Sequence, residues 1–242
     1  MNKDSIYDII KNNEQEAIIT ELKIIAEMQC GFDENFGVPR QSGLSDGVGY
    51  IVFKKEYSSP EAFREIEGFS HIWLIWGFSE NGDKWSPTVR PPRLGGNKRV
   101  GVFASRSPFR PNPIGISSVE FCGIEQVKEG IRLKIKGADL KNGTPIYDIK
   151  PYLPFTDSHP QAKYGYAEET RKQKLEVSAS EEMLAELPEE DREEILSALS
   201  QDPRPHYHKD GKGYTMAYAG MQISFTVNEK KLTITNIKKD SI

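Results

Sequence analysis

The feature that most constrains the fold is an apolar run at residues 69–78, FSHIWLIWGF. A membrane span takes about 20 apolar residues, so this run is too short to cross a bilayer as a helix. Its aromatic and β-branched residues favour a strand that is buried on both faces. We therefore expect the run to lie at the centre of a sheet.

Several other short segments have the period-2 alternation of half-buried strands. These segments are residues 21–28, 48–53 and 99–104, followed by 116–124 and 131–135, which flank a turn at 128–130 as in a hairpin. Only one short helix is expected among them, where Ser59-Pro60-Glu61 supplies an N-cap and a first-turn proline and Gly68 ends the helix. The pattern predicts a mainly β fold, a barrel or sandwich, and the absence of a G-x-G-x-x-G motif disfavours a Rossmann fold.

The character of the sequence changes after the prolines at 154–160. Ser178 and Glu181 have the spacing of a capping box, and an acidic helical stretch follows that breaks near Pro188. The chain then ends in two alternating runs, 222–227 and 232–237, which predict a hairpin. We therefore divide the chain into an N-terminal extension (1–18), a mainly β domain (19–160) and a small α+β C-terminal domain (161–242).

Charge is distributed unevenly along this chain of net charge -4. The negative total argues against a protein that coats nucleic acid over its whole surface. Residues 84–119, however, hold no acid and seven basic residues: Lys84, Arg90, Arg93, Lys98, Arg99, Arg106 and Arg110. A local site for an anion is expected there. The alternative is a solvated loop whose arginines pair with the acidic second domain.

Three loop segments are candidates for ligand binding. The first, RPPRLGGNKRVGVFASRSPFRPNPIG at 90–115, is dense in proline and glycine, which indicates an ordered loop whose arginines can grip phosphate or carboxylate. The second, GADLKNGTPIYDIKPYLPF at 137–155, carries polar groups beside the turn-forming pair Asn142-Gly143. The third, at 31–46, holds Pro39-Arg40-Gln41. An ordinary turn and an ordinary connection are the alternatives for the second and third.

Other kinds of site are not indicated. His71 lies within the apolar run and is expected to be a hydrogen-bonded core residue. His206 and His208 could share one face of a strand, but no third ligand is nearby, so we predict no metal site. The two cysteines, Cys30 and Cys122, are expected to be buried and unpaired. The N-terminus lacks the apolar core of a secretory signal, which predicts a cytoplasmic protein without a membrane segment.

The two long motifs at 90–115 and 137–155 resemble the TsaA-like, or TrmO, family of tRNA methyltransferases. The resemblance runs from about 19 to 157 and includes GVPRQ and FSHIWLIW. It implies a homodimeric β-barrel enzyme that uses S-adenosyl-L-methionine to methylate the exocyclic nitrogen of threonylcarbamoyladenosine beside the anticodon of certain tRNAs. The region after Ala179 is similar to the family only in outline, as a domain for RNA or dimer contacts.

The resemblance also implies site residues. Those for the cofactor are Pro39, Arg40, Gln41, Glu80, Asn81, Arg106, Ile116, Asp139, Leu140, Gly143 and Thr144. Ser79 stands where similar proteins tend to carry a histidine. We expect the tRNA anticodon stem-loop to contact Arg90, Arg93, Lys98, Arg99, Arg110, Lys150 and Tyr152.

The reaction itself needs mainly positioning, together with a group that takes a proton from the target nitrogen. Asp139 and Asp148 are the candidates for that catalytic role. Two other interpretations remain open. One is a non-catalytic barrel that binds RNA or a nucleotide, and the other is a protein that responds to S-adenosylmethionine and binds a partner through its acidic domain.

Overall fold

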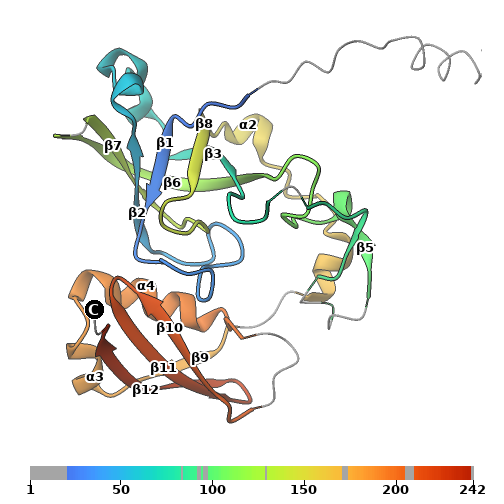
Figure 1. The fold of residues 1–242 in the computed structure, drawn as a ribbon, viewed down its shortest axis with the longest axis vertical. Coiled ribbons are helices and arrows are strands. Elements are labelled where there is room, and N and C mark those ends of the chain that lie inside the picture. Colours follow the sequence, from blue (N-terminus) through green and yellow to red (C-terminus); the bar gives the residue numbers. More distant parts are fainter. Residues whose placement is uncertain are drawn as a thin grey trace, which may run out of the picture.

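A computed structural model describes residues 21–82, 84–91, 94, 98–128, 130–170, 174–204 and 210–240. Six strands form a closed antiparallel barrel in the order β1-β2-β7-β6-β3-β8, seen in the upper half of Figure 1. Their bounds are β1 Ala26–Gln29, β2 Val48–Phe53, β3 His71–Gly77, β6 Ile114–Val127, β7 Gly130–Lys136 and β8 Pro145–Pro151. The predicted mainly β fold, and the barrel within it, are confirmed.

The barrel interior is filled by alternate residues of its strands. On β3, Ile72 and Leu74 point inward and are at most 1% exposed, and Val119 of β6 and Leu133 of β7 meet them in one core. The intervening residues of β3 are only half-buried or exposed. The expectation that residues 69–78 are buried on both faces is therefore wrong. In a barrel the second face of each strand points outward, and no layer covers this one completely.

The first strand and the predicted helix at residues 59–68 also differ from the expectation. The strand expected at residues 21–28 begins only at Ala26. The residues before it are not half-buried as alternation predicted, because Leu22 and Ile24 are 49% and 36% exposed. The segment predicted as one helix is two 3-10 turns, Pro60–Phe63 and Ile66–Gly68, separated by Glu65 in the left-handed region at φ 68°. A third 3-10 turn, Lys55–Tyr57, precedes them.

An arm of irregular chain leaves the barrel between β3 and β6, at the right of Figure 1. It holds the two-residue strands β4 Thr88–Val89 and β5 Val100–Gly101, which pair with each other. The predicted strand at 99–104 is therefore shorter, because a 3-10 turn, Val102–Ala104, replaces its second half. The hairpin of β6 and β7 is confirmed, with pairing from Glu120↔Lys136 to Val127↔Gly130.

A second unit follows a short helix, α2 Pro154–Asp157, and a 3-10 segment, Gly165–Thr170. Its sheet has the order β10-β11-β12-β9. The elements are β9 Glu176–Ser178, α3 Glu181–Ala185, α4 Glu189–Ser200, β10 Gly213–Tyr218, β11 Met221–Asn228 and β12 Lys231–Lys239. The predicted hairpin and the helix break near Pro188 are confirmed. The cap is Ser180, whose hydroxyl accepts from the Met183 N–H, so the expected pair of Ser178 and Glu181 is wrong.

The second unit has its own core, and that core extends into the first barrel loop. Phe32 is 1% exposed and meets the ring of Tyr218 edge-on at 4.9 Å between centroids. Beside it, the Ala219 N–H donates to the Gly31 carbonyl at 2.7 Å. The domain boundary predicted at residue 160 stays a prediction, but the loop at 31–46 clearly packs on both units.

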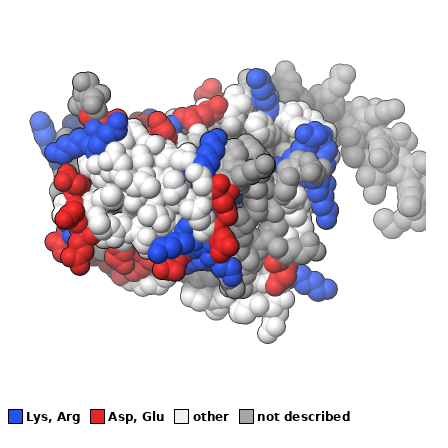
Figure 2. All heavy atoms as spheres, turned by 90° about the horizontal axis from the view of Figure 1, so that it is seen from below, with Lys and Arg blue, Asp and Glu red and all other residues white. Residues whose placement is uncertain are grey.

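The C-terminal sheet turns its other face outward. Side chains on that face are mostly Ser, Thr and Gln, as at Thr215, Gln222 and Ser224. Figure 2, viewed from the side of this unit, shows a broad uncharged area with acidic and basic side chains at its margins. Within the described parts of the chain, no helix is long and apolar enough to span a membrane.

Candidate functional site

Four loops meet at one end of the barrel, and they include all three segments singled out from the sequence. The turn that contains Gly143, at φ 75°, donates from its N–H to the Met28 carbonyl at 2.8 Å. The carbonyl of Gly137 accepts from the Gly43 N–H at 2.9 Å, which ties the end of β7 to the first loop. The loop after β3 and the basic arm complete the group. The fold thus brings together residues that lie about 100 positions apart.

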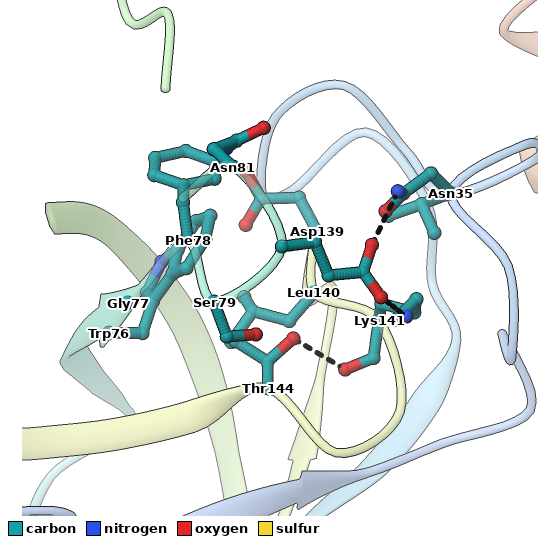
Figure 3. A pocket seen from close by; sticks show the side chains of 12 residues that line it. Asn35, Trp76, Gly77, Phe78, Ser79, Asn81, Asp139, Leu140, Lys141 and Thr144 are labelled. Atoms are coloured by element: carbon teal, nitrogen blue, oxygen red, sulfur yellow. Dashed lines mark hydrogen bonds and ion pairs between the residues drawn. The ribbon is translucent and has the colours of Figure 1, made fainter. Parts of the chain in front are cut away.

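Two cavities of about 120 and 260 Å³ open among these loops. Asp139, Trp76 and Phe78 line both, so the cavities are neighbouring parts of one site. Together they fall at the lower end of the range for small-molecule sites, roughly 300–1,000 Å³. The first cavity, drawn in Figure 3, is lined by Asn35, Val38, Trp76, Gly77, Phe78, Ser79, Glu80, Asn81, Asp139, Leu140, Lys141 and Thr144. The second is lined by Arg40, Gln41, Trp76, Phe78, Ser105, Arg106, Arg110, Ile114, Gly115, Ile116 and Asp139.

Asp139 is the acid that lines both cavities. Its carboxylate accepts a hydrogen bond from the hydroxyl of Ser117, and the backbone of Ser42 and the side chain of Arg106 lie close enough to favour its charged form. Loss of water contact raises the pKa of Asp139 above its ordinary value, and the bond from Ser117 opposes that rise. A carboxylate in such surroundings can attract a cation or take up a proton.

Aromatic rings form the wall between the two cavities. Trp76 and Phe78 lie 4.3 Å apart between centroids with their planes tilted by 59°. The indole ring lies over Gly115, where a Cβ atom would come within 2.3 Å of it. Any larger residue at that position would displace Trp76. Ring faces attract cations, so this wall complements the Asp139 carboxylate.

An ion pair closes the far side of the first cavity. Lys141 contacts Glu80, and Asn35 donates to the same carboxylate at 2.9 Å. The Lys141 and Asn35 bonds lower the pKa of Glu80. In Figure 3 the hydroxyl of Thr144 points to the backbone carbonyl of Lys141, which accepts its hydrogen bond at 2.7 Å. The loop after β3 is thereby joined to the turn at 139–144.

The arm arginines bond within the arm and to the first loop. Arg106 donates to the Gln41 side chain, and Arg110 donates to the carbonyls of Ser105 and Val102 at 2.7 and 3.1 Å. Arg99 donates to Thr88 at 2.8 Å. The alternative in which these arginines pair with the acidic second domain is therefore wrong for the three of them.

The structure separates the predicted residues into two groups. The predicted residues that line the cavities are Arg40, Gln41, Glu80, Asn81, Arg106, Arg110, Ile116, Asp139, Leu140 and Thr144. Pro39 is buried beside them, and Gly143 forms the turn. Arg90, Lys98, Arg99, Lys150 and Tyr152 line neither cavity. Asp148 lies on β8 in an ion pair with Lys150 at 2.9 Å, and it lines neither cavity. Arg93, His206 and His208 lie outside the described residues.

Sequence reasoning missed Trp76 and Ser117. A signal was present for Ser117, because the alternation of β6 that buries Val119 also points Ser117 inward, and a polar residue in a barrel interior needs partners. Two further expectations are wrong. His71 is exposed and bonded to Ser70 rather than buried in the core, and Cys122 is exposed. Both project from the outer face of the barrel.

Known proteins resemble this chain in sequence. The model of the tRNA-methyltransferase O N-terminal domain matches residues 27–158, and that of the TrmO C-terminal domain matches 172–240. A tRNA (adenine(37)-N6)-methyltransferase of Escherichia coli K12 is 40% identical over 216 residues, 85% of this chain and 92% of the relative. RcsF of Pseudomonas aeruginosa PAO1, described as an S-adenosylmethionine-dependent methyltransferase, is 39% identical over 78% of this chain and 84% of its own.

A solved structure also resembles the whole chain. The crystal structure of TrmO from Pseudomonas aeruginosa superposes with a TM-score of 0.75 at 28% identity. The superposition covers 93% of this chain and 100% of the other.

Proposed function

The chain belongs to the tRNA-methyltransferase O family, and from this premise we propose that it transfers a methyl group from S-adenosylmethionine to the N6 nitrogen of adenine 37 in tRNA. The observation that carries the site assignment is the position of Asp139, which lines both cavities at the barrel end. The finer substrate is adenosine that already bears a threonylcarbamoyl group.

The charged and aromatic side chains of the site suit the cofactor. S-adenosylmethionine carries a cationic sulfur and a carboxylate. The half-buried Asp139 and the rings of Trp76 and Phe78 suit the cation, and Arg106 suits the carboxylate. When bound, the cofactor supplies an electrophilic methyl carbon, which forms its bond to nitrogen as its bond to sulfur breaks. We assign the cofactor to residues 39–41, 80–81, 106, 116 and 139–144.

The protein contributes position and a proton acceptor. A displacement at carbon requires the nitrogen to lie about 3 Å from the methyl group and in line with the breaking bond, which the walls of a narrow site enforce. The nitrogen must also lose a proton, and Asp139 is the acid that both cavities reach. Asp148 is less suited, because it is paired with Lys150 on β8.

Binding of tRNA falls to the basic arm. We propose that Arg90, Arg93, Lys98, Arg99 and Arg110, together with Lys150 and Tyr152, contact the anticodon loop. Unpaired bases can be displaced and stacked there without melting a duplex. Arg90 and Arg99 are exposed, whereas the uncharged area in Figure 2 has basic side chains only at its margins.

A homodimer is the further part of this proposal. Large apolar side chains are exposed at the second cavity: Ile116, 51% exposed, lines it, and the ring of Phe103, 75% exposed, lies 5.7 Å from the guanidinium of Arg110, which also lines it. Exposed apolar groups close together are typical of interaction surfaces. Sedimentation should therefore give twice the chain mass of 27.4 kDa, and a monomer mass at micromolar concentration would contradict the dimer.

Labelled S-adenosylmethionine tests the function. We expect methyl groups to pass to tRNA that carries threonylcarbamoyladenosine and not to the same tRNA without that modification. Equal labelling of both tRNAs would overturn the finer substrate and leave the methyltransferase assignment standing. Labelling of neither would support the non-catalytic RNA-binding interpretation.

A further inference from the structure

Ser117 is a polar residue inside the barrel. It is 1% exposed, and it points to the interior from the same face of β6 as Gly115 and Val119. A buried hydroxyl is costly unless it is hydrogen-bonded. Ser117 has two partners, the indole of Trp76 on β3 and the carboxylate of Asp139 on the loop after β7. The three residues form a chain from the barrel interior to the floor of both cavities.

The direction of the two bonds follows from the groups themselves. An indole N–H can only donate, so the Ser117 oxygen accepts the bond from Trp76, at 2.9 Å. The single hydrogen of the hydroxyl is then free to be donated to Asp139, where it meets Oδ1. Because Oδ1 already accepts this hydrogen bond, a proton taken up by the carboxylate belongs on Oδ2.

We propose that Ser117 is a positioning residue. Its hydroxyl hydrogen bond occupies Oδ1 of Asp139, so that Oδ2 takes the proton of the substrate nitrogen. The inference rests on the proposed function. As the nitrogen gains the methyl carbon, its proton passes to Oδ2 and the carboxylate becomes a neutral acid. The electron pair of the broken carbon–sulfur bond stays on sulfur, so charge and atoms balance.

The same bond keeps Asp139 ready to accept a proton. Loss of water contact raises the pKa of this acid, and donation from Ser117 is the largest of the effects that lower it again. Without the hydroxyl, Asp139 would hold its proton to higher pH and would be blocked as an acceptor over a wider pH range.

The test compares Ser117→Ala with Ser118→Ala, a matched control that removes a hydroxyl from the neighbouring, half-buried position of β6. Ser117→Thr keeps a donor and should restore the wild-type behaviour. On the acid limb of the pH–rate profile we expect Ser117→Ala to lower kcat about tenfold, with little change in KM. The acid limb of its pH–rate profile should move up by about one pH unit, so that activity returns at higher pH.

A second readout needs neither cofactor nor tRNA. The chain has three tryptophans, so its nitrogen-15 spectrum should show three indole N–H signals. The Trp76 signal should titrate with Asp139 in the wild type and in Ser118→Ala, and should lose this dependence in Ser117→Ala. If Ser117→Ala fails to fold, Ser117→Cys keeps the volume with a weaker donor and should shift the profile less, in the same direction.

The two readouts separate the possible failures. Identical pH profiles and indole titrations in Ser117→Ala and the wild type would overturn the role of Ser117. A wild-type protein that methylates no tRNA at any pH would overturn the proposed function instead. The indole titration would still show whether Ser117 links Trp76 to Asp139.

Discussion

Asp139 and Glu194 are both acids withdrawn from water, and burial raises the pKa of each. Their surroundings differ. Asp139 lines two cavities and lies near the cationic Arg106, whereas Glu194 is 7% exposed and lines neither cavity. The comparison teaches that a perturbed pKa alone does not identify a reactive site. The acid must also be within reach of a ligand.

Glu194 belongs to the contact between the two units. It lies on α4 against Gly47 of the first barrel loop, where a Cβ atom would fall about 2 Å from its carboxylate. The Tyr218 hydroxyl donates to it, and Asp191 lies one helical turn away. Because Glu194 is buried between the two units and lines neither cavity, we expect it to affect stability and not to contact substrate.

The largest difference expected between the two acids is in catalysis. Asp139→Asn should lower methyl transfer about 100-fold or more, because it removes the proton acceptor and keeps the shape of the side chain. Glu194→Gln should retain transfer within about twofold at pH 6, because Gln resembles the neutral acid that predominates at that pH. Single-turnover rates on modified tRNA measure both. A transfer rate for Asp139→Asn that equals the wild-type rate would remove the distinction between the acids.

The second difference between the two acids is in stability, where Glu194 and not Asp139 is expected to have the larger effect. The pKa of Glu194 is about 7 in the folded protein against an ordinary value of 4.5, so the folded state binds the proton more tightly. The free energy of unfolding should therefore fall as pH rises from about 4.5 to 7, by up to about 3 kcal/mol.

Glu194→Gln should flatten this dependence and stabilise the protein at pH 8. The matched control is Glu193→Gln, which changes an exposed neighbour on α4 and should leave the curve as it is. Urea unfolding between pH 5 and 8 makes the measurement. A wild-type stability that is constant over this range would show that Glu194 is not held in its protonated form.

The sequence predicts the barrel better than it predicts its local detail. Alternation identified β2, β6 and β7, because inward and outward faces differ clearly in these strands. It did not identify β10, where Tyr214 and Tyr218 look equally suited to either face. It also overextended β1 to Leu22, since an apolar residue in an exposed lead-in segment has the same appearance as one in a strand.

The sequence predicts the loops of the candidate site but not the residues of its interior. Long motifs drew attention to Gln41, Arg106 and Asp139, which the structure brings to one barrel end. The role of Ser117 depends on a contact between β6 and the loop after β7, and no local pattern encodes that pairing. Conversely, Asp148 has the same motif context as Asp139, and only the structure reveals its ion pair with Lys150.

Calorimetric titration with S-adenosylmethionine tests most directly whether the barrel end is the cofactor site. We predict micromolar binding to the wild-type protein and weaker binding, by about tenfold, to both Gln41→Ala and Asp139→Ala, because each removes a polar group from the wall of the second cavity. Asp148→Ala, which alters an acid outside both cavities, should bind as the wild type does. Unchanged affinity in both Gln41→Ala and Asp139→Ala would contradict the assignment.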